Sequence, residues 1–342
     1  MRKISRSSYE AFNTCPRKHY YNYEWDATGV EAVEPSIDLT LGLGVHKGME
    51  LLLQGESVQE AARAGVGEFL LLTQSAGNDM RWNTMRKEGE RLIWAFVNGF
   101  PLAHPEFFTT FEVVDVEKEV RVALSGDVVL MARADAVVRD LNGALWVVNH
   151  KTCSSWDGSD WMYDVQMWTE ALAMEQHYGE PVHGCLVTGF LKGGRRSGVL
   201  STPLIYKWVK GEKEKDVYEA GGEKVLLSEE EILAKLGRID LAKHFPISPP
   251  VMRNDAVVEA WLDQVVRSES ENAHMLSPDV PEEDRLQHFW QRFTKWNCPF
   301  CPFKDVCYGL ASVEGMVESG KLRRRVDHHI MVEVRDEDNG AA

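Results

Sequence analysis

The sequence predicts a mixed α/β fold in which helices pack on a central β-sheet. Residues 109–152 read as three strands rich in Val, Ala and Leu, which are typical of buried β-structure. Between the last two strands, Asn142-Gly143 is a strong hairpin signal. Amphipathic helical patterns precede the strands at 82–100 and follow them at 161–178.

Length and charge place limits on the class of protein. The chain has 342 residues, enough for one large domain or two ordinary ones. It contains no run of about 18 apolar residues, and its beginning lacks the apolar core of a signal peptide, so we expect a cytoplasmic protein without a membrane partner. The net charge of −15 argues mildly against a nucleic-acid-binding protein, because contacts with the phosphate backbone need Lys and Arg. Basic residues crowd the first twenty positions, however, so a local basic groove remains compatible with the sequence.

The elements before the strands are predicted to be mainly helical. A short helix is expected to be capped by Ser7 or Ser8 and to end at Cys15-Pro16. The glycines after residue 38 predict a loop that enters a helix at about Val45, and 55–108 looks helical. His46 and Glu50 are four residues apart and share a helix face.

The elements after the strands are less regular. Residues 182–192 and 201–210 predict a further pair of strands around a GGRRSG turn. Residues 211–280 are polar, acidic and mostly helical in pattern, and their chemistry cannot be assigned. A helix over 283–296 leads into a cysteine cluster, and the chain ends in a charged tail.

Asp135, in the second strand, and Lys151, at the end of the third, can meet at one end of the sheet. A carboxylate supplies the oxygen ligands that Mg²⁺ or Mn²⁺ prefers, and a lysine can orient a water molecule or neutralise developing charge. With a carboxylate in place of Asn149, this would be a metal-dependent site for phosphodiester cleavage. The structural alternative is an ion pair of Asp135 with Arg133, Arg139 or Lys151.

The six cysteines are not expected to form disulfides in a cytosolic chain. Three of them, Cys298, Cys301 and Cys307, follow a C-x₂-C-x₅-C spacing, and Cys15-Pro16 is the best candidate for a fourth ligand. Four thiolates can hold either a structural Zn²⁺ or a [4Fe–4S] cluster, and the spacing alone does not separate the two.

Several short pieces resemble, in their order, the RecB-like branch of the PD-(D/E)XK nuclease superfamily, which includes Cas4-type and AddB-type nucleases with an iron–sulfur cluster. The resemblance runs from Ser5 to Cys307 and leaves 211–280 uncovered. The matching pieces are SRSSYEAFNTCPRKHYY, GLGVHKGME, ARADAVV, VVNHKT, VQMWTEALAM and CPFCPFKDVC.

The resemblance implies a restriction-endonuclease-like mixed sheet flanked by helices, with helical additions and a Cys-ligated cluster that joins the termini. It also implies one nuclease domain and a tail. The expected parts are a nuclease domain over 1–325 with its core at 38–210, a helical insertion of unknown role at 211–280, cluster-binding ends at 1–27 and 283–310, and a charged tail at 326–342.

The same resemblance implies roles for individual residues. His46 and Asp135 would be metal ligands for Mg²⁺ or Mn²⁺, with Glu50 a weaker candidate. Lys151 would be the catalytic lysine, Asp135 and Gln166 would also be catalytic residues, and Gln166 would act near the DNA. The [4Fe–4S] cluster would be held by Cys15, Cys298, Cys301 and Cys307. We also expect Arg17, Lys18 and Arg195 to contribute to a DNA-binding surface.

Two positions depart from the family pattern. Glu170 stands where a Tyr is common, which affects only a DNA contact. Asn149 stands at the acid of the D/E-x-K motif, as a catalytic and metal-ligand position, and an amide is a weaker Mg²⁺ ligand than a carboxylate. Asn149 is either a deliberate Asp→Asn change or the mark of a natural non-cleaving homologue, and the otherwise intact site favours the first.

The predicted function is therefore a metal-dependent DNA exonuclease or DNA-end-processing nuclease, impaired in this form by Asn149. Its expected substrates are single-stranded or frayed DNA ends, in repair or recombination, and the source is expected to be bacterial or a phage. Any helicase or recombination motor would be a separate chain, since helicase motifs are missing. The alternative is a non-catalytic nucleic-acid-binding or assembly protein that retains the fold.

Overall fold

The computed structural model describes residues 2–34, 36–77, 79–125, 128–196, 199–200, 202–208, 224–294 and 297–325. Two compact units make up the chain, and each is described by itself. The terminal unit comprises Met1–Glu34, Ala123–Met131 and Ala260–Ala342; the sheet unit comprises Pro35–Val122 and Ala132–Glu259. The predicted tail at 326–342 and residues 211–223 of the predicted insertion lie outside the described residues, and the single nuclease domain over 1–325 stays a prediction.

Helices and strands alternate along the chain in the sheet unit. Its helices are α3 (Ile37–Leu53), α4 (Val58–Leu72), α5 (Met80–Ala103), α6 (Phe107–Thr110), α7 (Val165–Tyr178) and α9 (Glu229–Leu236), with 3₁₀ turns at Asp160–Tyr163 and Leu241–Lys243. Its strands are β3 (Phe111–Ser125), β4 (Val128–Asp140), β5 (Leu145–Cys153), β6 (Val182–Leu191), β7 (Arg195–Arg196), β8 (Val199–Leu200), β9 (Tyr206–Trp208) and β10 (Lys224–Leu226). The strands β3 and β4 have residues in both units.

The main sheet is mixed, with strand order β1-β4-β5-β6 and with β3 also paired to β4. Strands β4 and β5 are antiparallel, with Ala136 opposite Val148, whereas β5 and β6 are parallel. As predicted, Asn142-Gly143 turns the hairpin: Gly143 has a φ of 84°, and the Asp140 carboxylate accepts the backbone N–H of Asn142 at 2.8 Å. The predicted mixed α/β architecture is confirmed.

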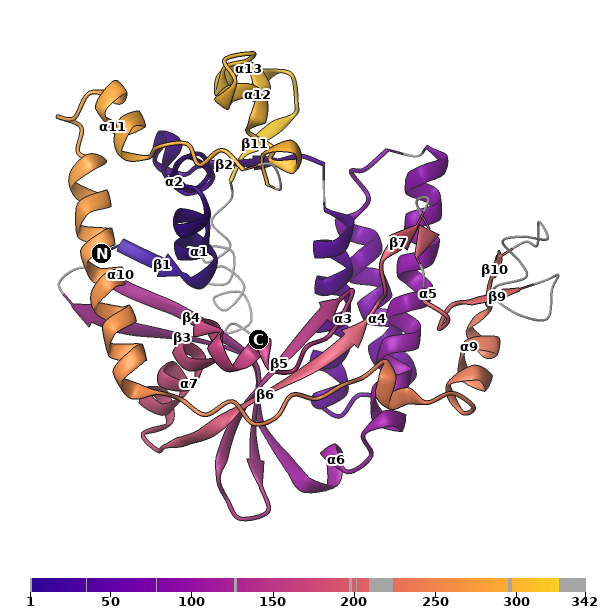
Figure 1. Ribbon diagram of the computed structural model, residues 1–342. Helices are drawn as coiled ribbons and strands as arrows, with labels where there is room; N and C mark the ends of the chain where they lie inside the picture. Colours follow the sequence, from indigo (N-terminus) through magenta and orange to yellow (C-terminus); the bar gives the residue numbers. More distant parts are fainter. Residues whose placement is uncertain are drawn as a thin grey trace, which may run out of the picture. The chain divides into compact units, whose positions relative to one another are not determined.

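Helices cover both faces of the sheet in this unit. Strand side chains alternate between faces, and Ala136, Val138 and Val148 belong to the same buried cluster as residues of α3 and α5. Helices α3, α4 and α5 lie side by side (Figure 1). Helix α7 packs on β5 and β6, where the Cys185 thiol donates to the backbone oxygen of Met167.

The glycine-rich loop predicted after residue 38 is wrong, because α3 already begins at Ile37, where the Ser36 hydroxyl caps it. Gly44 and Gly48 lie instead where α3 contacts α4 and α5. A Cβ on Gly65 of α4 would lie 2.4 Å from the backbone oxygen of Gly44 in α3, closer than atoms can approach. Small residues at this crossing let the two helix backbones come together.

The predicted pairing of 182–192 with 201–210 is also wrong. Strand β6, in 182–192, pairs in parallel with β5. Strand β9, in 201–210, pairs antiparallel with β10, and both of these strands follow the GGRRSG segment. Within the GGRRSG segment lies β7, which pairs antiparallel with β8 just after the segment. The turn residues of the sequence could not show that the longer strand, β6, pairs with β5 instead.

The terminal unit joins the first and last parts of the described chain. Its elements are β1 (Arg2–Ser5), α1 (Arg6–Thr14), α2 (Pro16–His19), a π-helical turn at Tyr20–Glu24, a 3₁₀ turn at Trp25–Ala27, β2 (Val30–Ala32), α10 (Asp255–Met275, which begins in the sheet unit), α11 (Glu282–His288), a 3₁₀ turn at Cys298–Phe300, α12 (Lys304–Cys307), α13 (Val313–Glu318) and β11 (Leu322–Arg324). Helix α1 ends before Cys15 as predicted, but Ser5 caps it in a box with Ser8. Strands β2 and β11 pair antiparallel, and Phe289 and Phe303 are buried in this unit's core.

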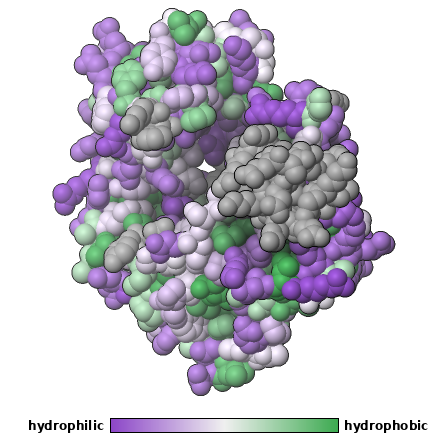
Figure 2. Space-filling view, turned by 45° about the vertical axis from the view of Figure 1, so that its right-hand side comes forward, coloured by the Kyte–Doolittle hydropathy of each residue, from purple (hydrophilic) through white to green (hydrophobic). Residues whose placement is uncertain are grey.

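Polar residues dominate the visible surface. Hydrophilic side chains cover much of the face in Figure 2, and hydrophobic residues form small separate patches among them. No helix in the described part of the chain has the length and apolar character needed to cross a membrane.

We predict that Gly65→Ala lowers the free energy of unfolding by about 1–3 kcal/mol, because the added methyl group meets the α3 backbone. The measurement is chemical denaturation. Gly67→Ala, on the same helix with nothing within 4 Å of the added Cβ, is the control. It should be neutral or stabilise by about 0.5–1 kcal/mol. Equal effects of the two substitutions would contradict the close-approach argument.

Candidate active site and cysteine pocket

A buried carboxylate, Asp135, is at the centre of the candidate active site. It lies on β4 with 7% of its surface exposed, just beyond the last β4–β5 pair, Ala136 with Val148. Its Oδ2 accepts the backbone N–H of His150 in β5 at 2.6 Å. The carboxylate therefore takes a place that a strand carbonyl would otherwise fill and faces the end of β5.

Two side chains from two other elements converge beside it. His46 of α3 places Nδ1 3.3 Å from Asp135 Oδ1 and 3.8 Å from Glu117 Oε1 of β3. One ligand atom from each of His46, Glu117 and Asp135 lies within 4.8 Å of the others. The other ring nitrogen of His46, Nε2, donates to the backbone oxygen of His150 at 2.9 Å, which leaves Nδ1 facing the carboxylates.

The electrostatics of this group follow from burial and charge. Burial opposes charge on His46, but the neighbouring Asp135 outweighs it and raises the pKa of the imidazole. Burial likewise acts to raise the pKa of Asp135, yet His46 and then Lys151 lower it well below the usual value. Burial raises the pKa of Glu117, and it lowers the pKa of His150 to about 4. Asp135 is therefore the most firmly ionised carboxyl of the group.

A second network surrounds the end of β5. Asn149 and Lys151 are two residues apart, so they point to the same face of the sheet, which α7 covers. Lys151 Nζ donates to Gln166 Oε1 at 3.0 Å and lies 3.5 Å from Asn149 Oδ1. Gln166 Nε2 in turn donates to Glu170 Oε1 at 2.6 Å. The four side chains form one hydrogen-bonded set.

Within that set, Glu170 is a buried carboxyl, 4% exposed, beside an amide. Asn149 Nδ2 donates to Glu170 Oε2 at 2.6 Å. Burial raises the pKa of Glu170 to about 7, against the attraction of Lys151. The i, i+4 spacing to Gln166 placed Glu170 on the correct helix face, but the sequence did not reveal its contact with Asn149.

The remaining sequence candidates of this unit have other partners. Of the proposed structural partners of Asp135, Arg133 pairs with Glu117 at 3.1 Å and Arg139 with Glu180. Glu50 pairs with Lys47 at 3.0 Å. Sequence reasoning missed Glu117. Its backbone in β3 has a left-handed φ of 50°, a conformation that a glutamate in the sequence does not predict.

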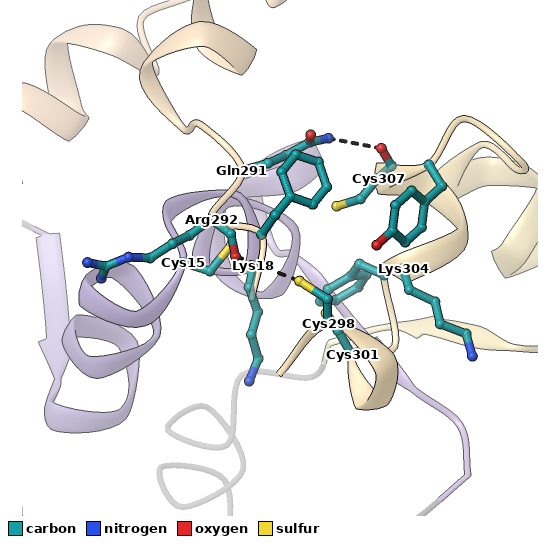
Figure 3. Close-up of a pocket in the computed structure, with 11 residues that line it drawn as sticks. Cys15, Lys18, Gln291, Arg292, Cys298, Cys301, Lys304 and Cys307 are labelled. Atoms are coloured by element: carbon teal, nitrogen blue, oxygen red, sulfur yellow. Dashed lines mark hydrogen bonds between the residues drawn. The ribbon is translucent and has the colours of Figure 1, made fainter. Parts of the chain in front are cut away.

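The cysteine pocket is a feature of the terminal unit. Cys15, between α1 and α2, lines it together with Cys298, Cys301 and Cys307 (Figure 3). Burial, and after it the neighbouring Cys301, Cys15 and Cys298, raise the pKa of Cys307 to about 11 against the opposing charge of Arg17. Burial also raises the pKa of Cys301, again with contributions from Cys15 and Cys298. All four cysteines therefore line one pocket, where Cys301 and Cys307 lie near the other two.

The three predicted DNA-contacting cations differ in their surroundings. Arg17 donates through Nε to the backbone oxygen of Phe289 at 2.6 Å and also to that of Leu286, so its guanidinium helps to hold the terminal unit together. Lys18 lines the cysteine pocket. Arg195 lies in β7, and its side chain is outside the described part of the chain.

The chain belongs to the PD-(D/E)XK nuclease superfamily, whose family model matches residues 3–308. A comparison with curated proteins finds no match. Nine solved chains match, and one of them is described as the crystal structure of SSO0001. It is 12% identical, covering 87% of this chain and 96% of that chain, with a TM-score of 0.25, which is too low to support any argument.

Membership in this superfamily implies a divalent metal, and the donor set fits one. Asp135 and Glu117 offer hard oxygen atoms, and His46 offers Nδ1 because the carbonyl of His150 fixes its other nitrogen. The candidate ligands come from α3, β3 and β4, which the packed core of this unit holds in place.

We predict that Asp135→Asn lowers the pKa of His46, because the largest charge that favours the imidazolium is removed. The measurement is an NMR titration of the His46 ring in metal-free protein. Glu117→Gln, which removes a weaker charge, should lower the same pKa by less. An unchanged pKa in Asp135→Asn would show that the two side chains are not paired in solution.

Proposed function

We propose that this chain is a metal-dependent DNA nuclease that hydrolyses phosphodiester bonds. The observation that carries the proposal is the convergence of His46, Glu117 and Asp135 close to Lys151, at the end of β5, in a chain of this superfamily. Burial and neighbouring charges raise the pKa of His46 and lower that of Asp135, and perturbed pKa values of this kind are typical of functional sites.

Each side chain has a definite task in the proposed reaction. A divalent cation, when bound to His46, Glu117 and Asp135, would stabilise the charge that develops on the phosphate. Lys151, held by Gln166 at 3.0 Å, would orient the attacking water and neutralise charge on the phosphate oxygens. Asn149, if it contributes a ligand, offers only a neutral oxygen.

We further assign the chain to the RecB-like branch, as an exonuclease or end-processing enzyme acting on single-stranded or frayed DNA ends in repair or recombination. A separate helicase would supply any motor. The finer assignment is supported by the order of the motifs and by a pocket lined by Cys15, Cys298, Cys301 and Cys307. Four thiols around one pocket fit a [4Fe–4S] cluster, which would have a structural role.

A second candidate function follows from Asn149. A fold that has lost the strand carboxylate could bind or assemble on DNA without cutting it. The donor set of His46, Glu117 and Asp135 would then be a remnant, and Lys18 and other cations would determine affinity.

We predict Mg²⁺- or Mn²⁺-dependent cutting of end-labelled DNA by the chain or by its Asn149→Asp variant, and a loss of at least about a hundredfold when Lys151→Ala is added to whichever is active. Gel assays on single-stranded and duplex substrates measure both. If neither protein cuts either substrate while DNA affinity is retained, the binding function replaces the nuclease.

We predict that Cys301→Ser removes the visible absorbance of anaerobically purified, brown protein and lowers its thermal stability, since cross-links that close long loops stabilise most. Cys153→Ser is the control, because Cys153 lies in β5 and not in the pocket. Stoichiometric zinc without colour would assign a zinc site instead. Retention of iron and stability by Cys301→Ser would contradict the cluster assignment.

A further inference from the structure

Position 149 and position 170 carry complementary groups. Asn149 is completely buried, and its amide nitrogen donates to Glu170 Oε2 at 2.6 Å. The same carboxylate accepts Gln166 Nε2 through Oε1, also at 2.6 Å. Both Glu170 oxygens are therefore fixed by neutral amide donors, one from the strand and one from the helix.

A buried carboxylate is costly unless it is paired with a positive charge and hydrogen-bonded. Within the described residues, no lysine or arginine forms an ion pair with Glu170, although Lys151 is near enough to attract it. A glutamine or an apolar residue at position 170 would fill the same space without the desolvation cost. The position therefore holds an acid at the expense of stability.

The hydrogen bonds also explain why the strand residue is an amide. An aspartate at position 149 would set its carboxylate against Glu170 across a contact of 2.6 Å, where two like charges repel. Asparagine instead donates to Glu170 and turns its own oxygen toward Lys151 and Gln166, at 3.5 and 3.3 Å. The Asn149–Glu170 pair therefore contains a single acid, and that acid is on α7 and not on β5.

We propose that Glu170 supplies the negative charge that the D/E-x-K motif normally carries on its strand, with Asn149 as the amide that positions it. This inference rests on the proposed nuclease function and makes the chain competent as it stands. Glu170 acts together with Asp135, and the Lys151 ammonium lies near enough to attract both carboxylates.

The test compares four full-length proteins: the chain itself, Glu170→Gln, Asn149→Asp and the double variant with both changes. Mn²⁺ affinity is measured from the EPR signal of free Mn²⁺, and cutting of end-labelled DNA is measured in parallel. Glu175→Gln, on the same helix but paired with Arg253 at 3.0 Å, is the matched control, and thermal unfolding checks that each variant folds.

We expect Glu170→Gln to lower Mn²⁺ affinity and cutting by about 10–100-fold, and Glu175→Gln to change neither. The double variant, which returns the acid to the strand, should recover both. The inference is overturned if folded Glu170→Gln keeps its Mn²⁺ affinity and its cutting activity, or if the folded double variant recovers neither of them. It is also overturned if the unchanged chain does not cut DNA and Asn149→Asp alone does. If none of the four cuts DNA, the proposed function fails, while the Mn²⁺ affinities still report whether Glu170 supplies the charge.

Discussion

The contact between Asp135 and the backbone N–H of His150 is the constraint on which the candidate active site depends. Through this 2.6 Å hydrogen bond, a carboxylate of β4 is fixed to β5 beyond their last paired residues. His46 then reaches both partners, since one ring nitrogen faces Asp135 and the other donates to the His150 carbonyl. One buried acid thus positions a helix residue and the strand that carries Lys151. Removing it would leave the buried N–H of His150 without its partner and would take from His46 the nearer of its two carboxylates.

Local signals predicted the parts of this arrangement that depend on one or two neighbouring elements. The Asn142-Gly143 turn and the two-residue alternation of strands were enough to place Asp135 and Lys151 at a common end of the sheet. The interhelical glycines were misread, because Gly44 is a contact with Gly65 only in three dimensions, and in sequence a glycine suggests a loop. Helix spacing likewise placed Gln166 and Glu170 together but gave no indication of what they face.

Glu117 could not have been found from sequence. In β3 the core-facing residues are Phe111, Val113 and Val116, so the alternation slips by one, which marks an irregular strand. It does not indicate that the next residue takes a left-handed conformation and turns its carboxylate toward His46. A non-glycine residue in that conformation is held by its surroundings, and such strain is common at functional sites.

The exchange of acid and amide between Asn149 and Glu170 shows why a motif read along one strand can mislead. A bound cation or the Lys151 ammonium interacts with any charge within a few ångströms. At that range a side chain of α7 can supply the charge as directly as a side chain of β5. A strand carboxylate and a helix carboxylate are interchangeable only if the partner position changes with them, since two acids in contact repel. An acid on helix α7 therefore requires an amide at position 149. By this proposal, the asparagine in the motif means that the negative charge is carried by Glu170 of α7, and not that the site lacks it.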